Sequence, residues 1–238
     1  METTGTIALS QMAAMQRQMD IIASNIANAN TTAFKGERMM FIEFLQSGEE
    51  ERFSYVQDYG TLRDLTVGSL TQTDNPLDIA INGEGYFQVK TAQGVRFTRS
   101  GHFRLDESGA IVTSDGDAVL GDGGQPLLAA GSGDIAVSTA GAVSVDGAKI
   151  GTLGVVTFDD EQALRKVVGG LYATDQQPQP VADVNLVQGV LENSNVEPIV
   201  QMTQMIELLR GYQNAQRLIV DDHEAKRRAI QVIAGTPS

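Results

Sequence analysis

The chain has 238 residues, enough for one or two domains with a sizeable hydrophobic core. It carries 17 Lys and Arg against 30 Asp and Glu, and the net charge of −13 disfavours binding to the negative backbone of nucleic acids. It contains no cysteine, which excludes disulfides and cysteine-ligated metal sites. We also find neither an apolar run long enough to span a membrane nor the pattern of a cleaved secretory signal peptide.

The first predicted element is an amphipathic helical arm in residues 1–34. Its apolar residues are spaced alternately three and four apart, which is the a/d pattern of a coiled coil. They are Ala8, Met12, Met15, Met19, Ile22 and Ile26. A lone helix of about 25 residues is only marginally stable in water, so this arm needs a partner. The partner is either the protein's own core, or the C-terminal helix together with other subunits.

Residues 35–75 are predicted to form an extended or irregular connector. Within it, residues 36–54 are interpreted as irregular or partly helical, and residues 55–64 as extended because polar and apolar residues alternate. Asn75-Pro76 marks the end of the connector, since the residue before a proline is disfavoured in helices.

The middle segment, residues 76–180, is predicted to be a mainly antiparallel β domain. Turn signals such as Asp-Gly, Ser-Gly and Gly-Gly recur about every 8–12 residues, as expected for short strands joined by hairpins. The first hairpin is predicted to turn at Asn82-Gly83.

A return connector, residues 181–197, is expected to lead into a long C-terminal helix in residues 198–238. Pro198 fits the first helical turn, where its missing N–H costs little. Ser194 and Glu197 have the spacing of a capping box, and Asn195 is a second candidate N-cap.

The predicted C-terminal helix carries two apolar stripes on adjacent faces. The first stripe contains Met205, Leu208, Tyr212, Ala215 and Ile219. The second stripe contains Ile199, Met202, Ile206 and Leu209. A helix with two such stripes needs more than one neighbour, so we predict that the stripes of both terminal helices form subunit interfaces. The predicted interface residues are Ala8, Met12, Met15, Met19, Ile22, Ile26, Ile199, Met202, Met205, Ile206, Leu208, Leu209, Tyr212 and Ile219.

Three motifs, in this order along the chain, resemble those of the flagellar rod and hook family. The family pattern Ala-Asn-x-x-Thr-Thr-Gly-Phe-Lys is matched near residue 30, except that Ala33 replaces the usual Gly. A second pattern starts at residue 75 and continues through Phe97-Thr98-Arg99, and a third, Leu-Glu-x-Ser-Asn-Val, starts at residue 191. The matching positions singled out are Asn28, Asn30, Thr31, Thr32, Phe34, Lys35, Asn75, Pro76, Leu77, Asp78, Gly83, Gly85, Leu191, Glu192, Ser194, Asn195 and Val196.

The resemblance implies an α+β fold in which long N- and C-terminal helices form a coiled-coil-like domain and the β domain lies between them in sequence. It also implies a structural subunit of the proximal flagellar rod that polymerises helically and transmits motor torque across the periplasm, with the distal rod as the alternative. The implied partners are other rod proteins, copies of the same chain and the flagellar export apparatus, with no membrane insertion, no nucleic acid and no cleaved signal peptide.

Motifs of catalysis and metal binding are weak in this sequence, so we expect neither an enzyme nor a bound cofactor or metal. The two histidines, His102 and His223, lack neighbours at metal-ligand spacing. Asp115-Gly116-Asp117 resembles only part of a calcium loop and is explained by turn formation. A different class of function, a β-rich binding module with oligomerising helices, would need converging polar residues that the sequence does not reveal.

Overall fold

The structure is a computed structural model that describes residues 2–47, 52–129, 133–181 and 183–235. These residues form two compact units. Unit 1 takes its described residues from 1–27, 37–64 and 197–238, and unit 2 takes its own from 28–36 and 65–196. Unit 1 holds both long helices, and the regular structure of unit 2 is mainly antiparallel strands, so the predicted α+β class with a mainly antiparallel β domain is confirmed.

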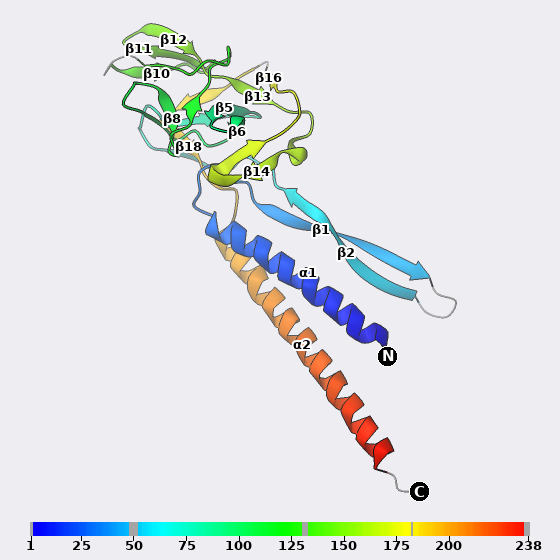
Figure 1. Cartoon of the computed structure of the whole chain (residues 1–238). Coiled ribbons are helices and arrows are strands. Elements are labelled where there is room, and N and C mark those ends of the chain that lie inside the picture. The colour runs from blue at the N-terminus through cyan, green and yellow to red at the C-terminus, as the bar shows by residue number, and fades with distance from the viewer. Residues whose placement is uncertain (1, 48–51, 130–132, 182, 236–238) are drawn as a thin grey trace. The chain divides into compact units, whose positions relative to one another are not determined.

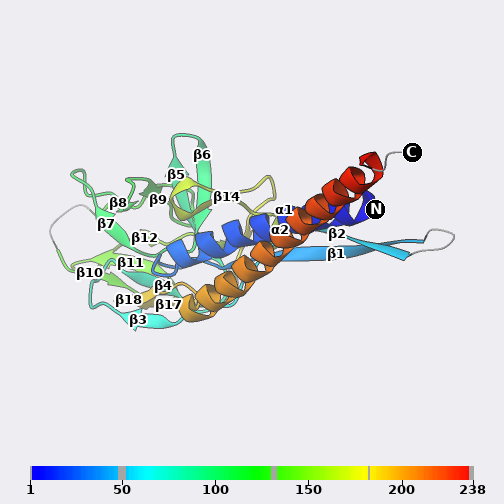
Figure 2. The same cartoon turned by 90° about the horizontal axis from the view of Figure 1, so that it is seen from below.

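Helices α1 (Glu2–Ala27) and α2 (Pro198–Ala234) lie side by side in unit 1, as both Figure 1 and Figure 2 show. The Asn25 side-chain amide donates to Gln201 Oε1 at 3.2 Å, near the end of α1 and the start of α2. Ten residues earlier in α1, Met15 Cε lies 3.5 Å from the position of a Cβ built on Gly211, ten residues later in α2. The two helices are therefore antiparallel.

The apolar stripe of α1 and the first stripe of α2 are largely shielded from solvent. On α1, Ile22 is buried, and Met12, Met15, Met19 and Ile26 are half-buried. On α2, the half-buried residues are Met205, Leu208, Tyr212, Ala215 and Ile219. The side chain of Ala8 lies outside the described part of the structure.

The second apolar stripe of α2 is exposed. The exposed fractions are 80% for Ile199, 50% for Met202, 52% for Ile206 and 45% for Leu209. Single exposed apolar residues are ordinary, but four in a row at helical spacing form a continuous apolar face.

Helix α2 begins as predicted at Pro198, but its predicted cap is wrong. The N-cap residue is Glu197, and it makes no side-chain capping bond. Ser194 Oγ instead accepts a hydrogen bond at 3.2 Å from the Val196 N–H, which precedes the helix. Asn195 belongs to unit 2 and bonds to other segments of that unit, as described below.

Strands β1 (Glu37–Ser47) and β2 (Arg52–Arg63) form a long antiparallel ribbon in unit 1, with a register shift between Met40 and Phe41. The prediction of an irregular or partly helical segment at residues 36–54 is therefore wrong for residues 37–47 and 52–54, and residues 48–51 lie outside the described part of the structure. Residues with high strand propensity, such as Phe41 and Ile42, occur throughout this stretch, and pairing with β2 satisfies the backbone groups that a lone strand would leave open.

Unit 2 is built from short antiparallel strands. They are β3 (Leu70–Gln72), β4 (Ile79–Ile81), β5 (Tyr86–Thr91), β6 (Gly94–Thr98), β7 (Phe103–Leu105), β8 (Ile111–Thr113), β9 (Ala118–Val119), β10 (Ile135–Val137), β11 (Ala142–Val145), β12 (Ala148–Thr152), β13 (Val155–Thr157), β14 (Arg165–Val167), β15 (Leu171–Ala173), β16 (Gln179–Pro180), β17 (Leu186–Gln188) and β18 (Val190–Glu192). The largest sheet has the order β14-β15-β6-β5-β9-β8-β7, and β13 joins it through β5 and also pairs with β16. Strands β10, β11 and β12 form a second sheet.

The return segment, predicted as a connector at residues 181–197, contributes two strands to the β structure, β17 and β18. Strand β17 pairs with β4, and β18 pairs with β3. The predicted hairpin at Asn82-Gly83 is therefore wrong, because β4 pairs with a strand about a hundred residues later and β5 pairs with β6. A long-range pairing of this kind leaves no signal in the local turn sequence.

The core of unit 2 is apolar and contains residues from the return segment. Phe87 and Phe103 meet edge to face with their ring centroids 5.1 Å apart, and Leu186 of β17 is 1% exposed. A second cluster contains Tyr86, Phe97, Val156, Phe158, Leu164 and Tyr172. Within the described residues, no helix is both long and apolar enough to cross a membrane.

Candidate functional site: a buried charge cluster where the motifs meet

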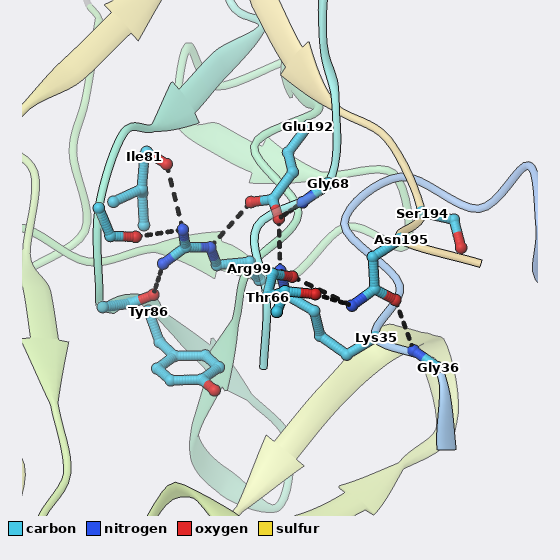
Figure 3. Close-up of polar contacts among 12 residues, drawn as sticks. Lys35, Gly36, Thr66, Gly68, Ile81, Tyr86, Arg99, Glu192, Ser194 and Asn195 are labelled. Atoms are coloured by element: carbon cyan, nitrogen blue, oxygen red, sulfur yellow. Dashed lines mark hydrogen bonds and ion pairs between the residues drawn. The ribbon is translucent and has the colours of Figure 1, made fainter. Parts of the chain in front are cut away.

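Glu192, the last residue of β18, is the centre of a buried charge cluster in unit 2 (Figure 3). Its Oε1 atom accepts a hydrogen bond from Lys35 Nζ at 2.6 Å, and its Oε2 atom accepts one from Arg99 Nε at 2.9 Å. The side chains of all three residues are at most 6% exposed. The cluster joins three distant parts of the sequence, and each part belongs to one of the three motifs.

Arg99 also holds the loop between β4 and β5. Its Nη1 atom donates to the Gly85 carbonyl at 2.6 Å, and its Nη2 atom donates to the carbonyls of Ile81 and Gly83. Gly83 and Gly85 have φ values of 136° and 127°, and residues with a side chain rarely adopt such values. This backbone conformation turns the loop carbonyls toward the guanidinium. The fork of Arg donors suits this task, since several acceptors are reached from one planar group.

Burial by itself raises the pKa of Glu192, because it disfavours the charged carboxylate. The Arg99 charge and the hydrogen bonds from Lys35 and Arg99 outweigh this effect and hold the pKa below its usual value of 4.5. A depressed folded-state pKa means that the carboxylate stabilises the fold fully above about pH 4.5 and loses this contribution as the pH falls through the folded-state value.

The N-terminal motif docks on the C-terminal motif beside this cluster. The Ala33 N–H donates to the Glu192 carbonyl at 2.8 Å, and the Asn195 N–H donates to the Phe34 carbonyl at 3.2 Å. The Asn195 Oδ1 atom accepts from the Gly36 N–H at 2.8 Å, and its Nδ2 atom donates to the Thr66 carbonyl at 3.0 Å (Figure 3). Asn195 is therefore a bridge between chain segments and not a helix cap.

Ala33 stands where the family usually has Gly, and its φ is 55°, in the left-handed region. This conformation costs an L-residue with a Cβ atom about 1–2 kcal/mol, and the buried Ala33 adopts it because its N–H and its neighbours are fixed on residues 192–195.

We expect Ala33→Gly to raise the free energy of unfolding by up to about 1 kcal/mol, because relief of this strain exceeds the added entropy of the unfolded chain. Chemical denaturation with an unchanged m-value measures the effect. Ala92→Gly, at an exposed residue without positive φ, is the control and should give no gain. An Ala33→Gly variant as stable as the parent or less stable would contradict the strain assignment.

The other predicted motif residues lie close to the cluster in sequence or shape the segments that carry it. Asp78 is buried and its Oδ1 atom lies 2.7 Å from His102 Nδ1, while its carbonyl accepts from the Gly189 N–H. Asn75 Oδ1 accepts from the Leu77 N–H at 3.2 Å, and the Pro76 carbonyl accepts from Gln188 Nε2 at 2.8 Å. The turn after α1 contains Asn28, Asn30, Thr31 and Thr32, and Leu191, Ser194 and Val196 flank Glu192 and Asn195.

The predicted interface residues form a separate group on the helices of unit 1 and do not contribute to the cluster. Sequence reasoning did not single out Arg99, Thr66 or Gly68, although Arg99 stands inside a quoted motif. The Gly68 N–H donates to Glu192 Oε1 at 3.0 Å, and a Cβ built on Gly68 would lie 2.0 Å from the Asn193 carbonyl oxygen. The available signal was that each of the three motifs carries a charged residue, Glu192 in one and the cations Lys35 and Arg99 in the other two, whose signs allow them to pair.

The cluster itself has the features of a structural site. Its charges are paired with one another, and the pocket beside it, lined by Lys35, Arg99, Tyr86 and Glu84 among others, has a volume of about 110 Å³. Typical ligand pockets are about 300 Å³ or larger. Among the described residues, no group of three or more His, Cys, Asp or Glu is placed to hold a metal ion.

Comparison with known proteins agrees with the motifs. Family models match three parts of the chain: "Flagella basal body rod protein" at residues 6–35, "Flagellar hook protein FlgE/F/G D1 domain" at residues 80–158, and "Flagellar basal body rod FlgEFG protein C-terminal" at residues 187–232. The flagellar basal-body rod protein FlgF of Caulobacter vibrioides is 36% identical over 94% of this chain and 95% of its own length. The chain belongs to the flagellar rod and hook protein family.

Two further relatives are a second FlgF and a rod protein with another name, FlgG. The FlgF of Rhizobium meliloti is 34% identical over 99% of this chain and all of its own length. The rod protein FlgG of Caulobacter vibrioides is 30% identical over 89% of this chain and 92% of its own length. The predicted family is confirmed, and these relatives are named as rod proteins and not as enzymes, in agreement with the non-enzymatic role expected from the sequence.

Proposed function

We propose that this protein is a structural subunit of the proximal rod of the bacterial flagellar basal body. It polymerises helically with copies of itself and with other rod proteins, and the rod transmits motor torque across the periplasm. The chain reaches this position through the flagellar export apparatus. Its functional surfaces are apolar helix faces that associate with neighbouring subunits, and no chemical reaction is involved.

The observation that carries the proposal is the exposed apolar face of α2. This chain belongs to a family of rod proteins, and its second stripe on α2 remains 45–80% exposed at Ile199, Met202, Ile206 and Leu209. The other stripe of the same helix faces α1. Burying a side chain of this kind stabilises an association by about 1.5–3 kcal/mol at most. A neighbouring subunit supplies the surface that the single chain lacks, and head-to-tail repetition of such a contact generates a filament.

The antiparallel arrangement of α1 and α2 supports a coiled-coil-like helical domain. The contacts of Asn25 with Gln201 and of Met15 with Gly211 differ by ten residues in each helix, so the register is constant over about three turns. With this register the stripe of α1 lies opposite Met205, Leu208, Tyr212, Ala215 and Ile219. We propose that the exposed second stripe then packs on a neighbour.

We expect Ile206→Asp to abolish incorporation into the rod. A charge placed in an apolar contact without a partner weakens it by at least about 1.4 kcal/mol, which is tenfold per contact, and the penalty repeats at every subunit. Motility and the amount of protein in isolated basal bodies measure the effect. The matched control is Asn214→Asp, at an exposed position on a different face of α2.

Circular dichroism should show that the Ile206→Asp monomer remains folded, because Ile206 is already half exposed. Incorporation of Ile206→Asp at the level of the Asn214→Asp control would refute the assignment of this face as a subunit contact.

The distal rod is the alternative position, because FlgG relatives also cover most of the chain. In the family that the chain resembles, FlgF is the proximal rod protein and FlgG the distal one. We favour the proximal rod since, within Caulobacter vibrioides, the identity to FlgF is 36% and the identity to FlgG is 30%. Complementation of Caulobacter strains lacking either protein tests the choice. Rescue of the strain without FlgF supports the proximal position, and rescue only of the strain without FlgG supports the distal one.

A further inference from the structure

Residues 28–36 form a short segment that belongs to unit 2, although α1 before it and β1 after it belong to unit 1. The segment contains turns but neither helix nor strand. The chain then runs through the whole β1–β2 ribbon before it returns to unit 2 at Leu65. Contacts with other parts of unit 2, and not regular secondary structure, therefore hold this segment in place.

The anchoring contacts are concentrated on residues 192–195. Two backbone hydrogen bonds join Ala33 to Glu192 and Asn195 to Phe34, and the side chain of Asn195 accepts from the Gly36 N–H. Lys35 adds its ion pair with Glu192, and Lys166 Nζ lies 3.9 Å from the centre of the Phe34 ring. The segment is thus docked by these contacts, by the hydrogen bond from Lys35 Nζ to the Thr66 carbonyl at 2.6 Å, and by the burial of Ala33 and Phe34, which are 4% and 6% exposed.

The charges of the cluster allow Lys35 to leave without stranding a buried charge. If Lys35 leaves, Glu192 keeps its ion pair with Arg99 and its hydrogen bond from Gly68, so the site that remains is neutral and hydrogen-bonded. Arg99 also keeps its bonds to the carbonyls of the 81–85 loop. Lys35 regains its hydration on release, and so no buried charge is left without a partner. Release therefore leaves no buried charge without a counter-charge, whereas removal of Glu192 would leave both Lys35 and Arg99 without one.

Ala33 adds a second bias toward release. Its left-handed φ of 55° is imposed while its N–H is bonded to the Glu192 carbonyl, and the residue can return to an ordinary conformation once it leaves. Strain of this kind persists only where surrounding contacts impose it.

We propose that the Lys35–Glu192–Arg99 cluster is a latch: residues 33–36 dock on residues 192–195 and release from them while the β structure of unit 2 stays folded. Arg99 and Glu192 form the fixed half of the latch, and Lys35 is its movable half. The latch links the segment after the N-terminal helix to the strand before the C-terminal helix. This inference concerns the single chain, and so it stands or falls independently of the proposed place in the rod.

Native-state hydrogen exchange on the full-length chain tests the latch. In the parent, the amides of Ala33 and Gly36 should exchange through a local opening with little denaturant dependence, whereas amides of β5 such as Val89 should exchange only on global unfolding. Lys35→Met should speed exchange of the first two amides about tenfold or more, because a buried charge-assisted hydrogen bond is lost, and should leave the β5 amides unchanged. Ala33→Gly should slow the same two amides.

Lys90→Met, which removes a charge from an exposed position of β5, is the control and should not change exchange at residues 33 and 36. If Ala33 and Gly36 exchange with the same denaturant dependence as β5 in the parent, the segment is a fixed part of the fold and the latch is refuted. The same conclusion follows if Lys35→Met leaves their exchange unaltered.

Discussion

Glu192→Gln is expected to lower the free energy of unfolding of unit 2 by about 3–5 kcal/mol, because the neutral amide leaves two buried cations, Lys35 and Arg99, without a counter-charge. Gln has almost the same shape as Glu, and so loss of packing does not account for the effect. Denaturant or thermal unfolding of the purified chain measures it.

The matched control is Glu84→Gln, an exposed carboxylate on the loop next to the cluster. It should change the stability by no more than about 0.5 kcal/mol, as is usual for surface substitutions. The difference between the parent and Glu192→Gln should also shrink as the pH falls below about 4.5, since the depressed pKa of Glu192 means that the parent then loses the same charge. A difference that is independent of pH would show that charge is not the cause.

Gly101→Ala is expected to destabilise unit 2 by about 3 kcal/mol or more, through a steric clash rather than through charge. A Cβ built on Gly101 would lie 1.6 Å from the Ile79 carbonyl oxygen, which is a backbone atom and cannot rotate away. Relief requires moving the loop at Gly101 away from the first residue of β4, and this breaks the hydrogen bond from the Ile79 N–H to the Gly101 carbonyl. The same displacement disturbs Phe87, whose ring edge lies 3.3 Å from the added methyl group.

Gly123→Ala is the control for this second substitution. No atom lies within 4 Å of a Cβ built there, and Gly123 has no positive φ. Its stability should therefore stay within about 0.5 kcal/mol of the parent, or rise slightly because the unfolded chain loses entropy. Equal effects of the two substitutions would mean that the close approach of residues 79 and 101 is not tight.

Much of the helical part of the fold was predictable because helices are specified by local patterns. The alternation of three and four from Met12 to Ile26 predicts one apolar face on α1, and Pro198 predicts the first turn of α2. The same reasoning failed at the cap of α2, where Ser194 and Asn195 have suitable side chains but bond elsewhere. Local spacing permits a cap, but Asn195 instead bonds Gly36 of a distant segment and Ser194 bonds the nearby Val196 N–H.

The β structure was predictable as a class and not in its pairings. Turn signals predict an antiparallel β domain, but β4 pairs with β17 and β3 with β18, each more than a hundred residues away. The ribbon at residues 37–63 was missed for a related reason, because strand pairing depends on a partner that the local sequence does not name. Strand propensity is set largely by such neighbours.

The family, the helical faces and the three motifs could be recognised from the residues alone, because they are carried by residue identity and short spacing. That Lys35, Arg99 and Glu192 belong to one site became visible only in the folded chain, since residues 64 and 93 positions apart come together only when the strands have paired. It also decided which stripe of α2 faces α1 and which stays open. Spacing along a helix defines two faces, but the register between two helices selects the one that is covered.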